Sequence, residues 1–174
     1  MLKGDVVTLT SLRPADAEQL FAWINDPALV RQSSSYTPVH YNGHKAWFRA
    51  VTQQPGAVIF AVRVGERLIG SCQLFDISPV HRSAELQIRL GDSAATGQGY
   101  GTDAVKTLLR FAAQDLGLHS VWLRVYASNQ RAIRCYEKAG LVRCGSLRQS
   151  AFVDGAWLDT VLMEIIFPDS RPTG

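Results

Sequence analysis

The feature that most constrains the fold of this chain is a glycine-rich turn between a predicted strand and a predicted helix. Residues 96–104 read TGQGYGTDA and place three glycines within five positions. The segment that follows, 99–117, carries an apolar stripe at helical spacing and ends on Gly117, so it predicts a helix. The segments 83–92 and 119–127 alternate or are rich in β-branched residues, and both predict strands. Strand, helix and strand in this order predict a right-handed crossover that begins at the glycines.

The remaining segments predict a mixed α/β protein. Antiparallel hairpins are predicted where alternating runs flank Gly65-Glu66 and Asp154-Gly155. The other expected elements are a strand at 5–12, a helix containing Leu20, Phe21 and Ile24, a loop at 33–43, helices at 44–54 and 129–140, and strands at 57–64 and 67–77. Together they predict an α/β (α+β) fold with a largely antiparallel central sheet of about seven strands and helices on both faces. We expect one domain over 1–168 and a loose tail at 169–174.

The composition is that of an ordinary globular protein. Hydrophobic residues make up 47% and charged residues 19% of the 174 positions, and the formal charge is +3. The basic residues are scattered singly, which argues against a nucleic-acid groove. No apolar run has the length of a signal-peptide core or a membrane span, and neither the three cysteines nor the four histidines show metal-ligand spacing. We therefore expect a reduced, cytoplasmic protein with no membrane association and no metal.

Two needs explain the glycines of the turn. A left-handed backbone favours residues without a side chain, and so does a ligand that touches the main chain. A helix N-terminus also presents N–H groups without partners, so the amides of 97–102 suit a phosphate or pyrophosphate. A Walker phosphate loop is disfavoured, because no Lys-Ser or Lys-Thr pair follows the glycines. A dinucleotide fingerprint is disfavoured too, because Thr102 stands at its third glycine position.

The glycine turn and the segment ASNQRAIRCYEKAGL at 127–141 together resemble the GNAT superfamily of acetyl-CoA-dependent N-acetyltransferases. The pyrophosphate signature of that family is Gln or Arg, two residues, Gly, one residue, then Gly or Ala. This chain keeps both glycines, as Gly99 and Gly101, and has Thr96 in the first position. The resemblance extends over about residues 5–167, and WINDPALVRQSS and HKAWF further resemble the branch of ribosomal-protein alanine, spermidine and nucleotide-amino-sugar acetyltransferases.

The resemblance implies acetyl-CoA as the acetyl donor and a sheet splayed between its fourth and fifth strands to admit the pantetheine arm. The matching tyrosine, Tyr136, lies near the thioester sulfur in the family and is proposed to protonate the leaving thiolate; a core aromatic is the alternative. The matching Asn129 contacts pantetheine, and it is also a suitable helix N-cap. The expected cofactor-binding residues are Ile88, Arg89, Leu90, Gly97, Gln98, Gly99, Tyr100, Gly101, Thr102, Asn129, Arg131 and Tyr136, with Lys106 and Arg134 as further cations.

Acetyl transfer to an ammonium group needs a group that removes its proton. Glu85, on the polar face of the strand at 83–92, is the first candidate, acting through a water molecule. The alternative is a structural carboxylate that is solvated or paired with an arginine. The N-terminal helices and the final hairpin would wall the acceptor site. The expected substrate-binding residues are Trp23, Trp47, Phe75 and Asp159, with Asp154 and Trp157 as further candidates.

These features predict an acetyl-CoA-dependent N-acetyltransferase in which a primary amine attacks the thioester directly. The branch resemblance makes a protein or peptide N-terminal amine the first choice of acceptor, and the absence of a dense acidic cluster argues against a polyamine. A small amine, such as an amino sugar, polyamine or antibiotic, is the alternative. A non-catalytic acyl-CoA-binding module is the alternative from another class, which the retention of Tyr136 disfavours. The oligomeric state that we consider for this chain is a homodimer.

Overall fold

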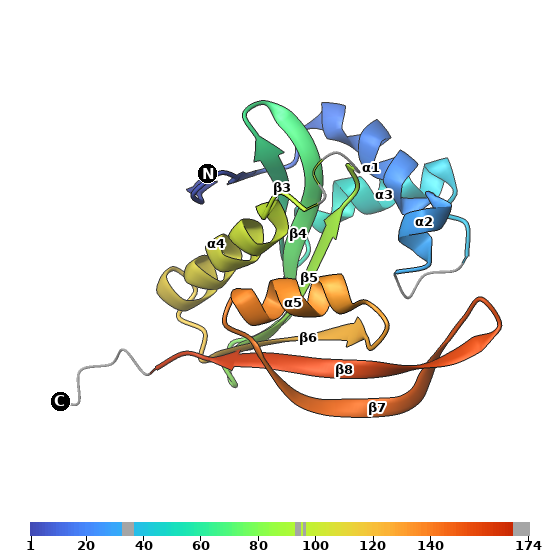
Figure 1. Ribbon diagram of the computed structural model, residues 1–174. Coiled ribbons are helices and arrows are strands. Elements are labelled where there is room, and N and C mark those ends of the chain that lie inside the picture. The colour runs from blue at the N-terminus through green and yellow to red at the C-terminus, as the bar shows by residue number, and fades with distance from the viewer. Residues whose placement is uncertain (33–36, 93–94, 96, 169–174) are drawn as a thin grey trace.

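The computed structural model describes residues 1–32, 37–92, 95 and 97–168, which form an eight-stranded sheet with helices on both faces (Figure 1). The strand order is β1-β2-β3-β4-β5-β6-β8-β7. The strands are β1 (Leu2–Lys3), β2 (Thr8–Thr10), β3 (Val58–Val64), β4 (Arg67–Ser78), β5 (Ser83–Leu90), β6 (Ser120–Tyr126), β7 (Val142–Val153) and β8 (Ala156–Ile166). The helices are η1 (Pro14–Asp16), α1 (Ala17–Ile24), α2 (Pro27–Val30), α3 (Tyr41–Val51), α4 (Tyr100–Gln114) and α5 (Gln130–Lys138). The predicted mixed, largely antiparallel sheet is confirmed.

The sheet opens between β5 and β6, its one parallel pair within the described chain. These strands pair only where Ser83 to Glu85 face Ser120 to Trp122. Beyond that point β5 stays paired with β4 as far as Leu90, while β6 stays paired with β8 as far as Tyr126. The two strands therefore diverge, which confirms the predicted splay between the fourth and fifth predicted strands. The divergence leaves one edge of β5 without a strand partner.

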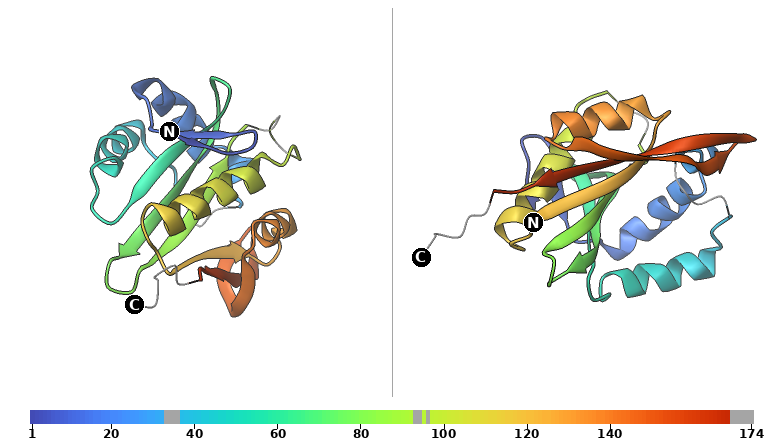
Figure 2. Two further views of the ribbon diagram at one scale, coloured as in Figure 1. Left: turned by 90° about the vertical axis from the view of Figure 1, so that its left-hand side faces the viewer. Right: turned by 90° about the horizontal axis from the view of Figure 1, so that it is seen from below.

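The helices form two layers, one on each face of the sheet. Helices α4 and α5 cover one face, and α1 to α3 cover the other (Figures 1 and 2). The core between the sheet and the α4 layer is built from fully buried apolar side chains, among them Leu108 and Ile133 from the helices and Leu123 and Met163 from the sheet. Helix α4 is amphipathic in the predicted way, because its apolar stripe faces this core.

Some predicted boundaries are wrong. The expected strand at 5–12 begins only at Thr8, as β2, because Asp103 of α4 accepts hydrogen bonds from the main-chain N–H groups of residues 5–7, and β1 is an additional strand that precedes these residues. Helix α3 begins at Tyr41 inside the expected loop, and α2 is an additional helix that Asp26 caps by accepting from the Ala28 N–H at 2.8 Å. Pro27 is the first residue of α2 and directly follows the Asp26 cap, an arrangement typical of a helix start.

The predicted hairpins are confirmed. Gly65 has a φ of +58° between β3 and β4. Asp154 and Gly155 have φ values of +49° and +79°, as a two-residue turn between β7 and β8 requires. No helix within the described residues is long and apolar enough to cross a membrane. Residues 33–36 of the expected loop, Thr96 of the glycine turn and the expected tail at 169–174 lie outside the described residues.

Candidate active site

The glycine turn presents bare main-chain amides at the start of α4. Gly97 and Gly99 have φ values of +79° and +81°, and a Cβ atom on either would meet open space. The left-handed backbone, rather than a lack of room, therefore explains these glycines. The first helical hydrogen bond runs from the Asp103 N–H to the Gly99 carbonyl at 3.1 Å. The N–H groups of Tyr100, Gly101 and Thr102 precede it, have no helical acceptor and form a suitable anion site.

A pocket of about 780 Å³ joins this turn to the gap between β5 and β6. Thirteen of the expected site residues line it: Phe75, Glu85, Ile88, Arg89, Leu90, Gly97, Gly99, Tyr100, Gly101, Thr102, Asn129, Arg131 and Tyr136. The pocket therefore brings the glycine turn, the free edge of β5 and the start of α5 together. This convergence supports the cofactor site that the sequence predicted.

Four expected site residues lie outside the lining of this pocket. Gln98 is exposed in the turn, and Trp47 is 40% exposed on α3. Trp23 is buried against the chain after β5, where a Cβ on Gly91 would lie 1.9 Å from its ring. Asp159 accepts a hydrogen bond from the Gln149 N–H at 2.8 Å. The two tryptophans and Asp159 thus have packing or hydrogen-bonding roles that their positions in the sequence do not reveal.

Helix α5 carries the two residues that the motif singled out. The side chain of Asn129 caps the helix by accepting from the Ala132 N–H at 3.1 Å. Tyr136 lies two turns later, lines the same pocket and is only 8% exposed. Burial, with a smaller contribution from Cys135, raises the pKa of the Tyr136 phenol well above its ordinary value. The phenol is therefore neutral near pH 7 and can act as a proton donor.

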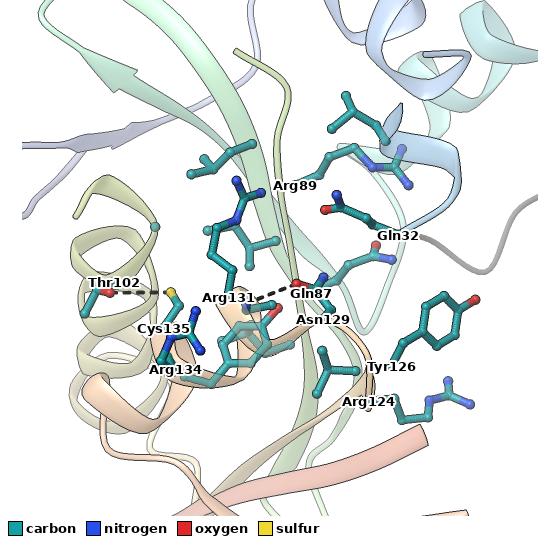
Figure 3. Close-up of a pocket in the computed structure, with 18 of the residues that line it drawn as sticks. Gln32, Gln87, Arg89, Thr102, Arg124, Tyr126, Asn129, Arg131, Arg134 and Cys135 are labelled. Atoms are coloured by element: carbon teal, nitrogen blue, oxygen red, sulfur yellow. Dashed lines mark hydrogen bonds between the residues drawn. The ribbon is translucent and has the colours of Figure 1, made fainter. Parts of the chain in front are cut away.

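The side of the pocket that faces helix α5 is positively charged. Arg131, Arg134 and Lys138 of α5 line it. The Thr102 hydroxyl donates to the Cys135 sulfur at 3.5 Å, which links the two helices at this point (Figure 3). Lys106, the further cation that the sequence suggested, is exposed and does not line the pocket. The bare amides and the α5 cations together fit the phosphates of coenzyme A.

Glu85 is buried at the base of the gap and forms an ion pair. The Arg124 Nε and Nη2 groups donate to the two Glu85 oxygens at 2.9 and 3.1 Å. This pairing is the structural alternative that the sequence left open. Glu85 still lines the pocket, and it is the one carboxylate among the described lining residues.

Several lining residues were not predicted from the sequence. They are Leu29, Gln32, Gln73, Leu86, Gln87, Ala95, Arg124, Val125, Tyr126, Ala132, Cys135, Lys138, Leu147, Ser150, Ala151 and Thr160. Arg124 and Tyr126 could have been found, because alternation along β6 places them on one face with Trp122. Ser150 and Thr160 could not, since their 2.7 Å hydrogen bond depends on a register shift in β7.

Asp154 and Trp157, the further candidates for the acceptor wall, lie at the tip of the β7–β8 hairpin. Asp154 forms a 3.3 Å ion pair with Arg31, which follows α2. Trp157 is 61% exposed and packs on Phe152, with 5.2 Å between ring centroids. Neither lines the pocket, but the ion pair connects the hairpin tip to the α2 region at its edge. Among the described residues, no group of three or more His, Cys, Asp or Glu side chains could hold a metal ion.

Comparison with protein families gives one match that covers most of the chain. The family described as "Acetyltransferase (GNAT) domain" matches residues 7–142. A spermidine N(1)-acetyltransferase from Vibrio cholerae is 33% identical over 101 residues, which are 58% of this chain and 58% of that protein. An aminoglycoside N(6')-acetyltransferase type 1 from Klebsiella pneumoniae is 26% identical over 83% of this chain and 78% of its own length.

Comparison with solved structures gives the same family. The crystal structure of the Vibrio cholerae spermidine N-acetyltransferase in complex with CoA and spermine has a TM-score of 0.86 to this chain. The match covers 92% of this chain and 95% of that one at 25% sequence identity. The whole arrangement of strands and helices described above is therefore shared with a solved acetyltransferase.

Proposed function

This chain belongs to the acetyltransferase (GNAT) family, and we propose that it transfers the acetyl group of acetyl-CoA to the primary amine of a small molecule. One observation carries the proposal: the bare amides of the glycine turn, the free edge of β5 and the buried phenol of Tyr136 meet in one pocket. A site that only bound a phosphate would need the first of these and not the other two.

The residues of this pocket fit the parts of acetyl-CoA. The amides of Tyr100, Gly101 and Thr102 and the α5 cations suit its phosphates. The unpaired edge of β5 at Ile88 to Leu90 offers main-chain groups to the pantetheine arm and the acetyl carbonyl. Acetyl-CoA supplies an activated acetyl group and a thiolate leaving group. The binding residues would hold the thioester at the gap between β5 and β6.

Two side chains are proposed to move protons. Tyr136, kept neutral by burial, holds a proton that it can give to the leaving sulfur. Glu85 is the proposed acceptor of the amine proton, through a water molecule. Arg124 occupies one hydrogen-bonding position on each Glu85 oxygen, and a carboxylate oxygen has a second. The ion pair would thus hold the carboxylate in place without blocking it.

A small amine fits the evidence better than the peptide N-terminus that the sequence suggested. The relatives named above are acetyltransferases of spermidine and of aminoglycosides, which are small molecules. The ion pair between Arg31 and Asp154 also connects the α2 region with the β7–β8 hairpin at the edge of the pocket. An extended polypeptide would need a continuous open groove there.

The test is a screen for acetyl-CoA-dependent thiol release across polyamines, amino sugars, aminoglycosides, amino acids and peptides. We expect turnover with at least one small amine and a product of one added acetyl group by mass spectrometry. Turnover with peptides alone would contradict the small-amine acceptor. Tight acetyl-CoA binding by calorimetry without turnover of any amine would instead indicate the non-catalytic binding module.

A further inference from the structure

Arg89 is a half-buried cation without a partner inside the pocket. Within the described chain its guanidinium has no ion pair and no hydrogen bond. The other buried or pocket-lining arginines of this face are neutralised: Arg63 pairs with Asp16 at 2.6 Å, and Arg124 pairs with Glu85 at 2.9 Å. Burial lowers the pKa of Arg89, because the cation loses water there. A cation that loses water and gains no protein partner is suited to an anionic ligand.

The side chain of Arg89 lies on the acceptor side of β5. Leu90 faces the glycine turn, since a Cβ on Gly101 would lie 3.4 Å from Leu90 Cδ1. Successive strand residues point to opposite faces, so Arg89 points away from that turn. Figure 3 shows Arg89 beside Gln32, with β5 between this pair and Arg134 of α5. The phosphates of coenzyme A, held on the α5 side, therefore leave Arg89 free.

The rest of this side carries both polar and apolar side chains and no unpaired negative charge among the described lining residues. Glu85 is the one lining carboxylate, and Arg124 already neutralises it. Gln87 accepts a hydrogen bond from Gln73 Nε2 at 2.5 Å, and these amides lie next to Arg89 along the strands. A polycation such as spermidine would meet Arg89 with no carboxylate to balance it. A ligand with negative charge would instead complete the site.

We propose that the acceptor of this enzyme is a small amine that also carries an anionic group, a carboxylate or a phosphate, and that Arg89 binds this group. The proposal rests on the proposed function, because it takes this pocket to be the acceptor site. A guanidinium binds either anion through paired, charge-assisted hydrogen bonds. Its positive charge also disfavours the ammonium form of a nearby amine, so it increases the fraction that can attack the thioester.

The experiment compares matched amines that differ in the anionic group. Glucosamine 6-phosphate is paired with glucosamine, each of several amino acids is paired with its amide, and spermidine serves as the polycation. We expect kcat/KM for the anionic member of at least one pair to exceed that of its partner by about tenfold or more. Arg89→Met, which removes the charge and keeps the length, should reduce this ratio to about one, with KM for acetyl-CoA unchanged. Arg89→Lys should retain part of the ratio. The phosphate and carboxylate pairs distinguish the two anions.

A matched control is Arg131→Gln on the other side of β5. This variant should raise KM for acetyl-CoA and leave the ratio between paired amines as in the wild type. The proposal is overturned if the wild-type enzyme prefers spermidine or the member of every pair that lacks the anionic group. It is also overturned if Arg89→Met keeps the preference for the anionic member. Neither result contradicts the proposed acetyl transfer.

Failure of the proposed function has a different signature, because no amine in the panel is then acetylated. In that case, phosphate binding by the CoA-loaded protein tests the role of Arg89. Inorganic phosphate should raise the Tm of the CoA-loaded wild-type protein and not that of CoA-loaded Arg89→Met. An equal rise in both proteins overturns the role of Arg89.

Discussion

Burial of one phenol gives the residue-scale argument for catalysis. Tyr136 is 8% exposed, and its raised pKa keeps the hydroxyl protonated over the whole working pH range. A phenol is a slightly weaker acid than a thiol in water, so proton transfer to a departing thiolate depends on position. Its place on α5, two turns after the Asn129 cap, fixes that position.

Tyr136→Phe tests this argument directly. Loss of the hydroxyl should lower kcat by about tenfold or more, while KM for acetyl-CoA stays within about twofold. Tyr41→Phe is the matched control, because its hydroxyl contacts Glu18 on α1 and lies outside the pocket lining. Steady-state kinetics of both variants provide the measurement. An unchanged kcat in Tyr136→Phe would remove the phenol as the acid.

The pH profile of the wild-type enzyme adds a second check on Tyr136. An acid must stay protonated, and the raised pKa of Tyr136 extends its protonated range upward from the ordinary value of about 10. Deprotonation of the acceptor amine increases as the pH rises. Activity should therefore rise toward alkaline pH with no fall below about pH 10. A descending limb centred below that pH would indicate a different acid.

The residues expected to bind the cofactor line the pocket more completely than the residues expected to bind the acceptor. Gly99 and Gly101 lie in one short motif and Asn129 and Tyr136 in another, and the family resemblance that both motifs carry indicated that they share one site. The acceptor side is built from separate strands and the α2 region, and it depends on side-chain direction. Trp23 illustrates the difficulty, because the sequence alone does not distinguish an aromatic side chain that lines a pocket from one that packs in the core.

At the scale of elements, the N-terminal segment is held by a single carboxylate on α4. Asp103 accepts hydrogen bonds from the main-chain N–H groups of Asp5, Val6 and Val7 at 2.9, 2.8 and 2.8 Å. Gly4 approaches so closely that a Cβ there would lie 2.6 Å from Asp103 Oδ2. These contacts join residues almost a hundred positions apart, so no sequence pattern could predict them. They also explain why the strand predicted at 5–12 begins only at Thr8.

Asp103→Asn should therefore destabilise the fold, by about 1–3 kcal/mol in the free energy of unfolding at pH 7. Burial opposes ionisation of this carboxyl, but the three main-chain donors and Arg110 outweigh it and lower the pKa of Asp103. The folded pKa lies below the unfolded one, so this stabilisation is present above about pH 4 and is lost as the pH falls through the folded value.

Urea denaturation at pH 7 and at pH 3 gives the measurement for Asp103→Asn. The difference from wild type should be large at pH 7 and smaller at pH 3. Asp115→Asn, at the exposed C-cap of the same helix, is the control and should change stability by less than about 0.5 kcal/mol. Equal stability of Asp103→Asn and wild type at pH 7 would contradict the proposed clamp.

The sequence predicted the presence of helices and strands more reliably than the residues at which they begin and end. The apolar stripe of α4 and the alternation of β5 are strong periodic signals, and both elements lie where they were expected. Helix α3 begins early because the Tyr41 ring packs edge-on against Phe21 of α1, with 5.3 Å between centroids. This tertiary contact outweighs the weak helix propensity of Gly43, and propensity alone cannot show it.

At the scale of the molecule, the β7–β8 hairpin has the largest group of exposed apolar side chains. It carries five of them within the described residues: Val142, Leu147, Phe152, Trp157 and Ile166, each between 46% and 61% exposed. β7 is also an edge strand, with one row of main-chain groups unpaired in the sheet. Figure 2 shows the hairpin extending beyond the helices that cover the rest of the sheet. An exposed apolar edge of this length favours pairing with another chain.

We therefore expect a second copy of the chain on this surface, in agreement with the homodimer considered from the sequence. Trp157→Lys combined with Phe152→Lys removes the stacked ring pair and adds charge, so the oligomer should dissociate to monomer at micromolar concentration. Light scattering coupled to size exclusion measures the mass of each form. Val80→Lys places the same charge on an isolated side chain that is 82% exposed after β4, and it should leave the mass unchanged. A wild-type protein that is already monomeric would contradict the assignment of this surface, and dissociation by Val80→Lys would place the interface elsewhere.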